Sequence, residues 1–185
     1  MVLSFYSING LAGHGFMNSF ANIEWLPKAG LTPNQSLYFL DSFAEKIEVL
    51  VSLKEGHQEK IYLKLSKEKL AEIVEMAKGK KIEEAKLATK HYLEYLNQGF
   101  EENRDEKDQE YLTLLNTILE HRYILGFEYP ELPKGTRREI LRNTDSTLIS
   151  LYEKIEALLP RSLSDSLFFK KDEVNWIWEI ATEGK

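Results

Sequence analysis

Helix-period apolar stripes run through the second half of the 185-residue chain, and they constrain its fold more than any other feature. Residues three and four positions apart lie on one face of a helix, so apolar residues at that spacing mark a buried face. These stripes predict a bundle of packed helices over residues 66–160. The four stripes are Leu70, Ile73, Val74 and Ala77; Ile82, Ala85, Thr89, Tyr92, Leu93 and Leu96; Tyr111, Leu115, Ile118 and Leu125; and Ile140, Leu141, Thr144, Leu148, Leu151, Ile155 and Leu158.

Breaks between the stripes predict where the helices end. Gly79 and Gly99 follow the first two stripes, and Pro160 follows the last. Glycine and proline are the residues that most often end a helix. The connection at residues 129–135 is short, so the two helices beside it should form an antiparallel hairpin.

The first 65 residues carry strand-like patterns. Residues 2–8 look like a short strand, and residues 47–54 and 61–65 alternate between apolar and polar positions. Alternation of this kind favours a β-hairpin, although residues 47–54 also suit the end of a helix that begins near Pro33. With the first strand, the hairpin would form a small antiparallel sheet.

These patterns predict a single domain over residues 1–185, of the α+β class and predominantly α. Residues 1–65 would form the small N-terminal antiparallel sheet and one helix. Residues 66–160 would form a bundle of four or more helices, and residues 161–185 would form an aromatic tail that docks on the bundle.

Charge and composition exclude several function classes. The net charge of −6 opposes a general attraction to nucleic acid or to anionic lipid. The absence of cysteine excludes disulfides, thiolate metal sites and a cysteine nucleophile. No apolar run reaches the roughly 18 residues of a membrane span, and the N-terminus lacks the basic flank of a signal peptide. We therefore expect a soluble, cytoplasmic protein.

A glycine-rich turn follows the first predicted strand. Gly10, Gly13 and Gly15 surround His14, and glycines there would let backbone amides approach a phosphate. The order of the glycines matches neither the dinucleotide-binding fingerprint nor the Walker loop. A tight or flexible turn is the favoured interpretation, and weak phosphate or nucleotide binding is the alternative.

The histidines and serines form no recognisable catalytic or metal-binding pattern. His91 and Glu94 share a helix face, but the Glu-x-x-His order of di-metal bundles is absent, as is His-Glu-x-x-His. No serine lies in a Gly-x-Ser-x-Gly elbow. We therefore predict no catalytic residue, no metal and no cofactor.

Basic residues cluster at the predicted start of the last long helix. Lys134, Arg138 and Arg142 oppose the helix dipole there, which costs free energy unless an acidic group lies nearby. Pairing with acids of the same hairpin is the favoured interpretation, and contact with an anion, a nucleic acid or an acidic protein is the alternative.

Two further arginines fall on buried faces. Arg122 lies in the middle of the third stripe, and Arg137 lies on the fourth. A buried guanidinium needs a partner, so we predict a structural charged cluster with Glu128 and Glu131 at the loop end of the hairpin. Replacing Arg122 with alanine should then lower thermal stability far more than replacing Arg138.

The tail concentrates large aromatic residues: Phe168, Phe169, Trp176 and Trp178. Such residues dominate interface hot spots, but they also dominate tails that dock on their own domain. Self-docking is favoured over contact with a partner or with a second copy in a homodimer.

These features favour a binding or regulatory protein that acts through protein–protein interaction, of the inhibitor, immunity or adaptor type, without catalytic apparatus. A protein partner is expected, and nucleic acid and membrane are not. The alternative is an enzyme or a phosphate- or nucleotide-binding protein that uses residues 10–15.

Overall fold

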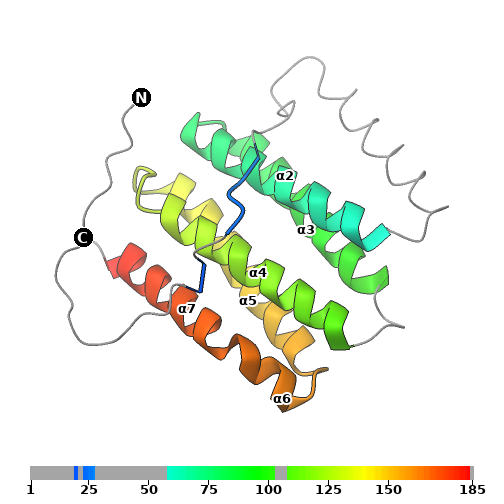
Figure 1. The fold of residues 1–185 in the computed structure, drawn as a ribbon. Coiled ribbons are helices and arrows are strands. Elements are labelled where there is room, and N and C mark those ends of the chain that lie inside the picture. Colours follow the sequence, from blue (N-terminus) through cyan, green and yellow to red (C-terminus); the bar gives the residue numbers. More distant parts are fainter. Residues whose placement is uncertain (1–18, 21–22, 28–57, 103–107, 184–185) are drawn as a thin grey trace.

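The computed structural model describes residues 19–20, 23–27, 58–102 and 108–183. Every regular element within these ranges is a helix (Figure 1). In chain order they are α2 (Gln58–Lys78), α3 (Ile82–Glu102), α4 (Asp108–Glu128), α5 (Thr136–Glu156), α6 (Arg161–Ser164), the 3-10 helix η1 (Asp165–Leu167) and α7 (Phe168–Glu183).

The long helices form two layers. α2, α4 and α7 lie side by side in one layer, and α3 and α5 lie behind them (Figure 1). The pairs α2/α3 and α4/α5 are antiparallel hairpins, and the hairpin of α4 and α5 is the one that the short connection at residues 129–135 predicted. α7 runs parallel to α4, because the chain crosses back along α5 before α7 begins. Residues 23–27 pass over α4 in an extended conformation.

The α2/α3 hairpin is tightly packed because small residues line it. Ala71 and Ala77 of α2 and Ala85 and Ala88 of α3 are buried. A β-carbon at Gly99 of α3 would lie 3.5 Å from the β-carbon of Tyr62 in α2, which is ordinary van der Waals contact. Short side chains let two helix backbones approach closely.

The predicted stripes form the core. Leu115, Ile118 and Leu125 of α4 are fully buried, and Leu141, Leu148 and Ile155 of α5 are buried opposite them. Burial of each such side chain contributes about 1.5–3 kcal/mol, so these stripes supply much of the driving force for packing. The four helices predicted from the stripes are confirmed. Two of the predicted ends are wrong, since α3 continues through Gly99 to Glu102 and α5 ends at Glu156, before the exposed Leu158.

The predicted sheet is wrong. Residues 61–65 belong to α2, and no strand occurs in the described ranges, so this part of the chain is all helical rather than α+β. The buried residues of this segment are Tyr62, Leu65, Ser66 and Lys69, spaced by three and four positions. That spacing is helical, and the alternation at 61–65 is only a fragment of it. The predicted strands at 2–8 and 47–54 and the helix near Pro33 lie outside the described residues.

Candidate binding surface

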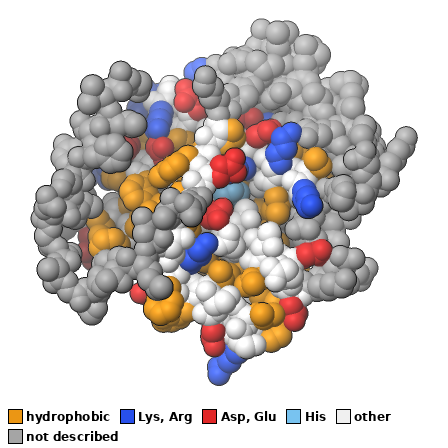
Figure 2. Space-filling model, in the orientation of Figure 1, with side chains coloured by type: hydrophobic (Ala, Val, Ile, Leu, Met, Phe, Trp, Pro, Cys, Tyr) orange, Lys and Arg blue, Asp and Glu red, His pale blue; other side chains and the backbone are white. Residues whose placement is uncertain are grey.

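An exposed pair of phenylalanines marks the start of α7. Phe168 is 60% exposed and Phe169 is 65% exposed, and their rings meet edge to face at 5.6 Å. We call these two residues the aromatic corner. Hydrophobic, acidic and basic side chains lie next to one another at the lower end of the molecule, where Figure 1 places α6 and the start of α7 (Figure 2).

The aromatic corner is exposed because the buried face of α7 points elsewhere. Val174, Trp178 and Ala181, which are four and three positions apart, pack against the bundle. Phe168 and Phe169 lie about 120° and 140° away from Val174 around the helix. Of the four predicted aromatic contacts, Trp178 is therefore a core residue, Trp176 is half-buried, and the two phenylalanines face solvent.

A groove of about 200 Å³ lies beside Phe168, at the junction of α5, α6 and α7. Carboxylates predominate among its charged side chains, because three acids accompany one lysine. Its lining residues are Glu156, Ser164, Asp165, Phe168, Lys171, Asp172 and Asn175.

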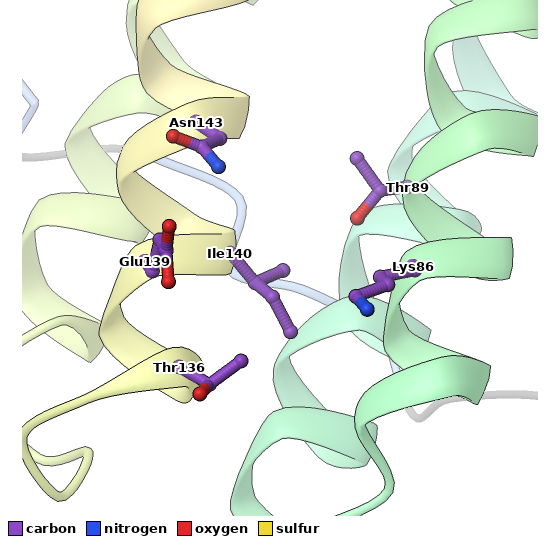
Figure 3. Close-up of a pocket in the computed structure, with 6 residues that line it drawn as sticks. All are labelled: Lys86, Thr89, Thr136, Glu139, Ile140 and Asn143. Carbon is purple, nitrogen blue, oxygen red and sulfur yellow. The ribbon is translucent and has the colours of Figure 1, made fainter.

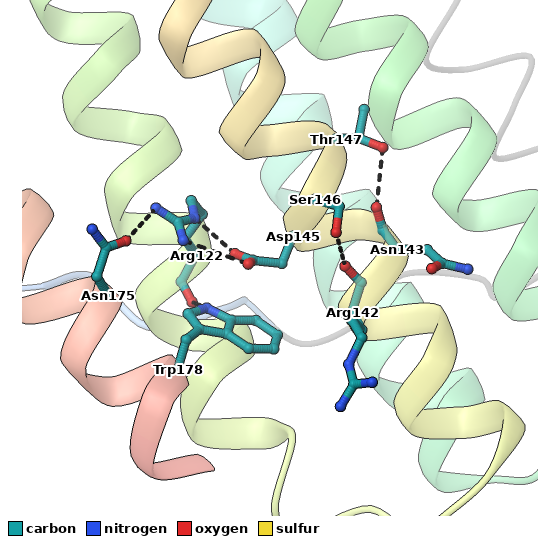
Figure 4. Close-up of polar contacts among 8 residues, drawn as sticks. All are labelled: Arg122, Arg142, Asn143, Asp145, Ser146, Thr147, Asn175 and Trp178. Atoms are coloured by element: carbon teal, nitrogen blue, oxygen red, sulfur yellow. Dashed lines mark hydrogen bonds and ion pairs between the residues drawn. The ribbon is translucent and has the colours of Figure 1, made fainter. Parts of the chain in front are cut away.

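A buried charged network fixes α7 in place. Arg122 of α4 is 4% exposed, and its Nε donates to Oδ1 of Asp145 in α5 at 2.7 Å (Figure 4). Its Nη1 donates to Oδ1 of Asn175 in α7 at 3.2 Å. Trp178 of α7 donates from Nε1 to the backbone oxygen of Arg122 at 2.9 Å. One arginine therefore ties three helices together.

Burial is costly for the carboxylate of this network. It raises the pKa of Asp145 above its ordinary value, and the hydrogen bond and positive charge of Arg122 offset this effect only in part. A buried carboxylate stays ionised only when such a partner compensates for lost hydration. The pair is thus a structural unit in which neither charge is dispensable alone.

A second contact anchors α7 to α5 at the groove. Lys171 donates to Oε2 of Glu156 at 2.8 Å, and its Nζ lies 4.7 Å from the ring centre of Tyr152. Burial and the adjacent Glu156 carboxylate raise the pKa of Tyr152 above its ordinary value. The Tyr152 phenol therefore stays neutral, and its ring forms a cation–π contact with Lys171.

Tyr92 and His121 form a buried polar pair deeper in the bundle. The Tyr92 hydroxyl lies 3.0 Å from Nδ1 of His121. Burial, with a smaller contribution from the positive charge of Lys67, lowers the pKa of His121 to about 3. The imidazole is therefore neutral at physiological pH, and the pair links α3 to α4.

The predicted cluster of Arg122 and Arg137 with Glu128 and Glu131 does not form, because Arg122 and Glu128 have other partners. Arg122 binds Asp145, and Glu128 pairs with Lys78 of α2 at 2.6 Å. Arg137 is half-buried, and Glu131 is exposed. Asp145 was not among the predicted partners, although its position between Leu141 and Leu148 at helical spacing places it on the buried face.

The basic residues at the start of α5 hold the α4–α5 turn. Arg138 donates to the backbone oxygens of Leu132 and Pro130, and Arg142 donates to the Tyr129 hydroxyl at 2.7 Å. Both guanidinium groups lie over the Tyr129 ring, at 5.2 and 5.7 Å. Lys134 is exposed at the tip of the turn. Arg138 and Arg142 thus have hydrogen-bond partners within the chain, and their position needs no external anion to explain it.

A second groove, of about 320 Å³, lies between α3 and α5 (Figure 3). Ile140 projects into it, and Lys86 and Glu139 stand on opposite sides. Lys86 already pairs with Glu83 at 2.8 Å, and the Thr89 hydroxyl donates to the backbone of its own helix. None of the described residues that line this groove is aromatic, whereas Phe168 lines the first groove.

The glycine-rich turn, with Gly10, Gly13, His14 and Gly15, lies outside the described residues and stays a prediction. Within the described ranges, no group of three or more metal-ligating side chains comes together. No helix in these ranges is both long and apolar enough to cross a membrane.

Residues 30–123 match the family described as Domain of unknown function (DUF5667). The chain belongs to this family. In the described part, the DUF5667 match covers α2, α3 and α4 as far as Tyr123. The aromatic corner and its groove lie beyond it, on α5, α6, η1 and α7. No protein of curated function and no solved structure matches the chain.

Proposed function

We propose that the chain is a binding protein of the inhibitor, immunity or adaptor type, and that it contacts a protein partner through the aromatic corner. The observation that carries this proposal is the exposure of two adjacent phenylalanines on a helix that is otherwise held firmly in place. Exposed aromatic groups on a rigid support are typical of interface hot spots.

The energetics of the aromatic corner support this role. Fully burying one phenylalanine contributes about 1.5–3 kcal/mol. Covering the exposed parts of both rings would therefore contribute about 2–4 kcal/mol to association. Because α7 is already ordered against α4, little of that gain would be lost to ordering the helix on binding.

The buried polar groups support a structural role rather than a catalytic one. Arg122, Asp145, His121 and Tyr92 are all largely shielded from solvent, and they form two separate pairs across helices, Arg122 with Asp145 and Tyr92 with His121. A substrate would have to unpack the bundle to reach them. We therefore assign these residues to the scaffold that presents the aromatic corner.

Affinity capture from the native cell tests the proposal, with the full chain as bait. The double variant Phe168→Ser/Phe169→Ser should lose a partner that the unchanged chain retains. Phe127→Ser is the matched control, because Phe127 is 46% exposed on α4, outside the aromatic corner. Capture that depends equally on Phe127, or that survives the double substitution, would count against the proposal.

A further inference from the structure

The groove beside Phe168 carries an excess of negative charge. Among the described residues that line it, Lys171 is the one cation, and Glu156 already binds it at 2.8 Å. Asp165 and Asp172 are exposed and add two further carboxylates. Their two charges exceed the roughly half positive charge at the N-terminus of α7. The local potential therefore favours a cation.

The Phe168 ring provides a second feature that suits a cation. It forms part of the groove wall and is 60% exposed. Aromatic faces attract ammonium and guanidinium groups, and they also pack against the methylene groups of lysine and arginine. Carboxylates next to an aromatic face would thus contact both parts of a long basic side chain.

The size of the groove limits what can enter it. Its volume of about 200 Å³ is below the roughly 300–1,000 Å³ typical of sites for drug-sized ligands. A single long side chain is a better match for this space than a nucleotide or another cofactor. The net charge of −6 would also steer a basic partner toward the chain.

We infer that this groove receives a lysine or arginine side chain of the partner protein, whose neighbouring apolar residues cover Phe168 and Phe169. The inference rests on the proposed function and adds the chemistry of the partner to it. Phe169 then contributes apolar contact outside the groove, and Asp165 and Asp172 select for the basic residue.

Selection from a phage-displayed library of random peptides tests this inference, with the immobilised full chain as the target. The selected peptides should share a lysine or arginine next to a large apolar residue. As synthetic peptides, they should bind the variant Asp165→Asn/Asp172→Asn about tenfold more weakly, because two exposed charge contacts are lost. Added salt should weaken their binding to the unchanged chain but barely affect the variant.

Glu139→Gln, in the groove between α3 and α5, is the matched control and should leave peptide affinity within about twofold. Circular dichroism of each variant should show unchanged melting, because all three substituted side chains are exposed. Peptides that need Phe168 and Phe169 but lack a basic residue would overturn this inference and leave the proposed function standing. Recovery of no peptide, or only of peptides indifferent to the aromatic corner, would count against both.

Discussion

At the scale of single residues, Arg122 and Asp145 show how a buried charge can specify helix positions. Exposed ion pairs such as Lys86 with Glu83 contribute about 0–1 kcal/mol, because water competes for both partners. The Arg122–Asp145 pair is nearly excluded from water. Separating the two partners would leave a buried charge unpaired, which costs much free energy. The pair therefore disfavours any other register of α4 against α5.

Replacing Arg122 with alanine should lower the free energy of unfolding by about 3–5 kcal/mol, since Asp145 would stay buried without its partner. Urea denaturation measures this change. Arg138→Ala is the comparison, because its hydrogen bonds to the α4–α5 turn are partly exposed and should be worth about 1–2 kcal/mol. Equal losses in the two variants would contradict the assigned role of Arg122.

His121 predicts a loss of stability in acid. Its pKa is about 3 in the folded chain against an ordinary value of 6.5, so the unfolded chain takes up a proton first as the pH falls. The free energy of unfolding should therefore decrease between pH 6.5 and 3, by on the order of 4 kcal/mol at the lower limit. Urea denaturation across this range measures the slope.

The variant His121→Asn isolates the histidine contribution. Asparagine keeps an acceptor near the Tyr92 hydroxyl but does not titrate. This variant should show a flatter dependence of stability on pH, with carboxylates accounting for what remains. An unchanged slope would show that His121 is not the titrating group.

The sequence predicted that Arg122 must have a buried ion partner, but it did not predict which residue that partner is. The position of Arg122 on an apolar stripe predicted a buried ion pair, which the structure contains. The predicted partners were acids near the turn, because the sequence does not reveal which facing residue lies at the same height. That height depends on how α4 and α5 are offset along their axes.

At the scale of helices, the contact between α4 and α7 depends on a close approach at Gly126. A β-carbon there would lie 2.8 Å from Cγ2 of Ile177 and 3.3 Å from Nε1 of Trp178. Gly126→Ala should therefore push α7 outward and destabilise the fold by about 1–3 kcal/mol despite the better helix propensity of alanine.

Gly99→Ala is the matched control for this prediction. Gly99 lies near the end of α3 as Gly126 lies near the end of α4, and its added β-carbon would meet only ordinary contacts. This variant should be neutral or more stable by up to about 1 kcal/mol. Thermal melting of the two variants distinguishes them, and a stabilised Gly126→Ala would rule out the tight contact.

The strand predicted at residues 61–65 was wrong because this short stretch was interpreted without the residues that follow it. Residues 61–65 alternate, and five residues cannot distinguish a strand from one face of a helix. The buried residues of α2 continue from Tyr62 through Leu65 and Lys69 to Ile73. Ser66 and Lys69 are buried but polar, so they separate the apolar residues at 61–65 from the stripe that begins at Leu70.

At the scale of the whole molecule, α7 has two opposite faces with different roles. One face packs on α4 through Val174, Trp178 and Ala181, while the aromatic corner remains in solvent. Removing everything after Pro160 would therefore remove a helix that packs on the core as well as the proposed surface. Point substitutions at Phe168 and Phe169 separate these roles, since both side chains are exposed.

The sequence predicted a tail that docks on its own domain, with partner contact as the alternative, but it did not indicate which of the aromatic residues of the tail faces outward. Composition alone cannot separate Trp178 from Phe169, because both are large and apolar. Only the rotation of α7 against α4, set by Gly126 and Arg122, buries one and exposes the other. The groove depends likewise on the turn through α6 and η1, which no local pattern indicated.

Site-specific photo-crosslinking in the native cell is the most direct test of the central claim that the aromatic corner binds a partner. Phe169→p-benzoylphenylalanine should give a discrete adduct with one protein, whereas the same substitution at Leu87, which is 40% exposed on α3, should not. The adduct should disappear when Asp165 and Asp172 are changed to asparagine. A chain that forms no adduct from position 169, or the same adduct from position 87, would contradict the account.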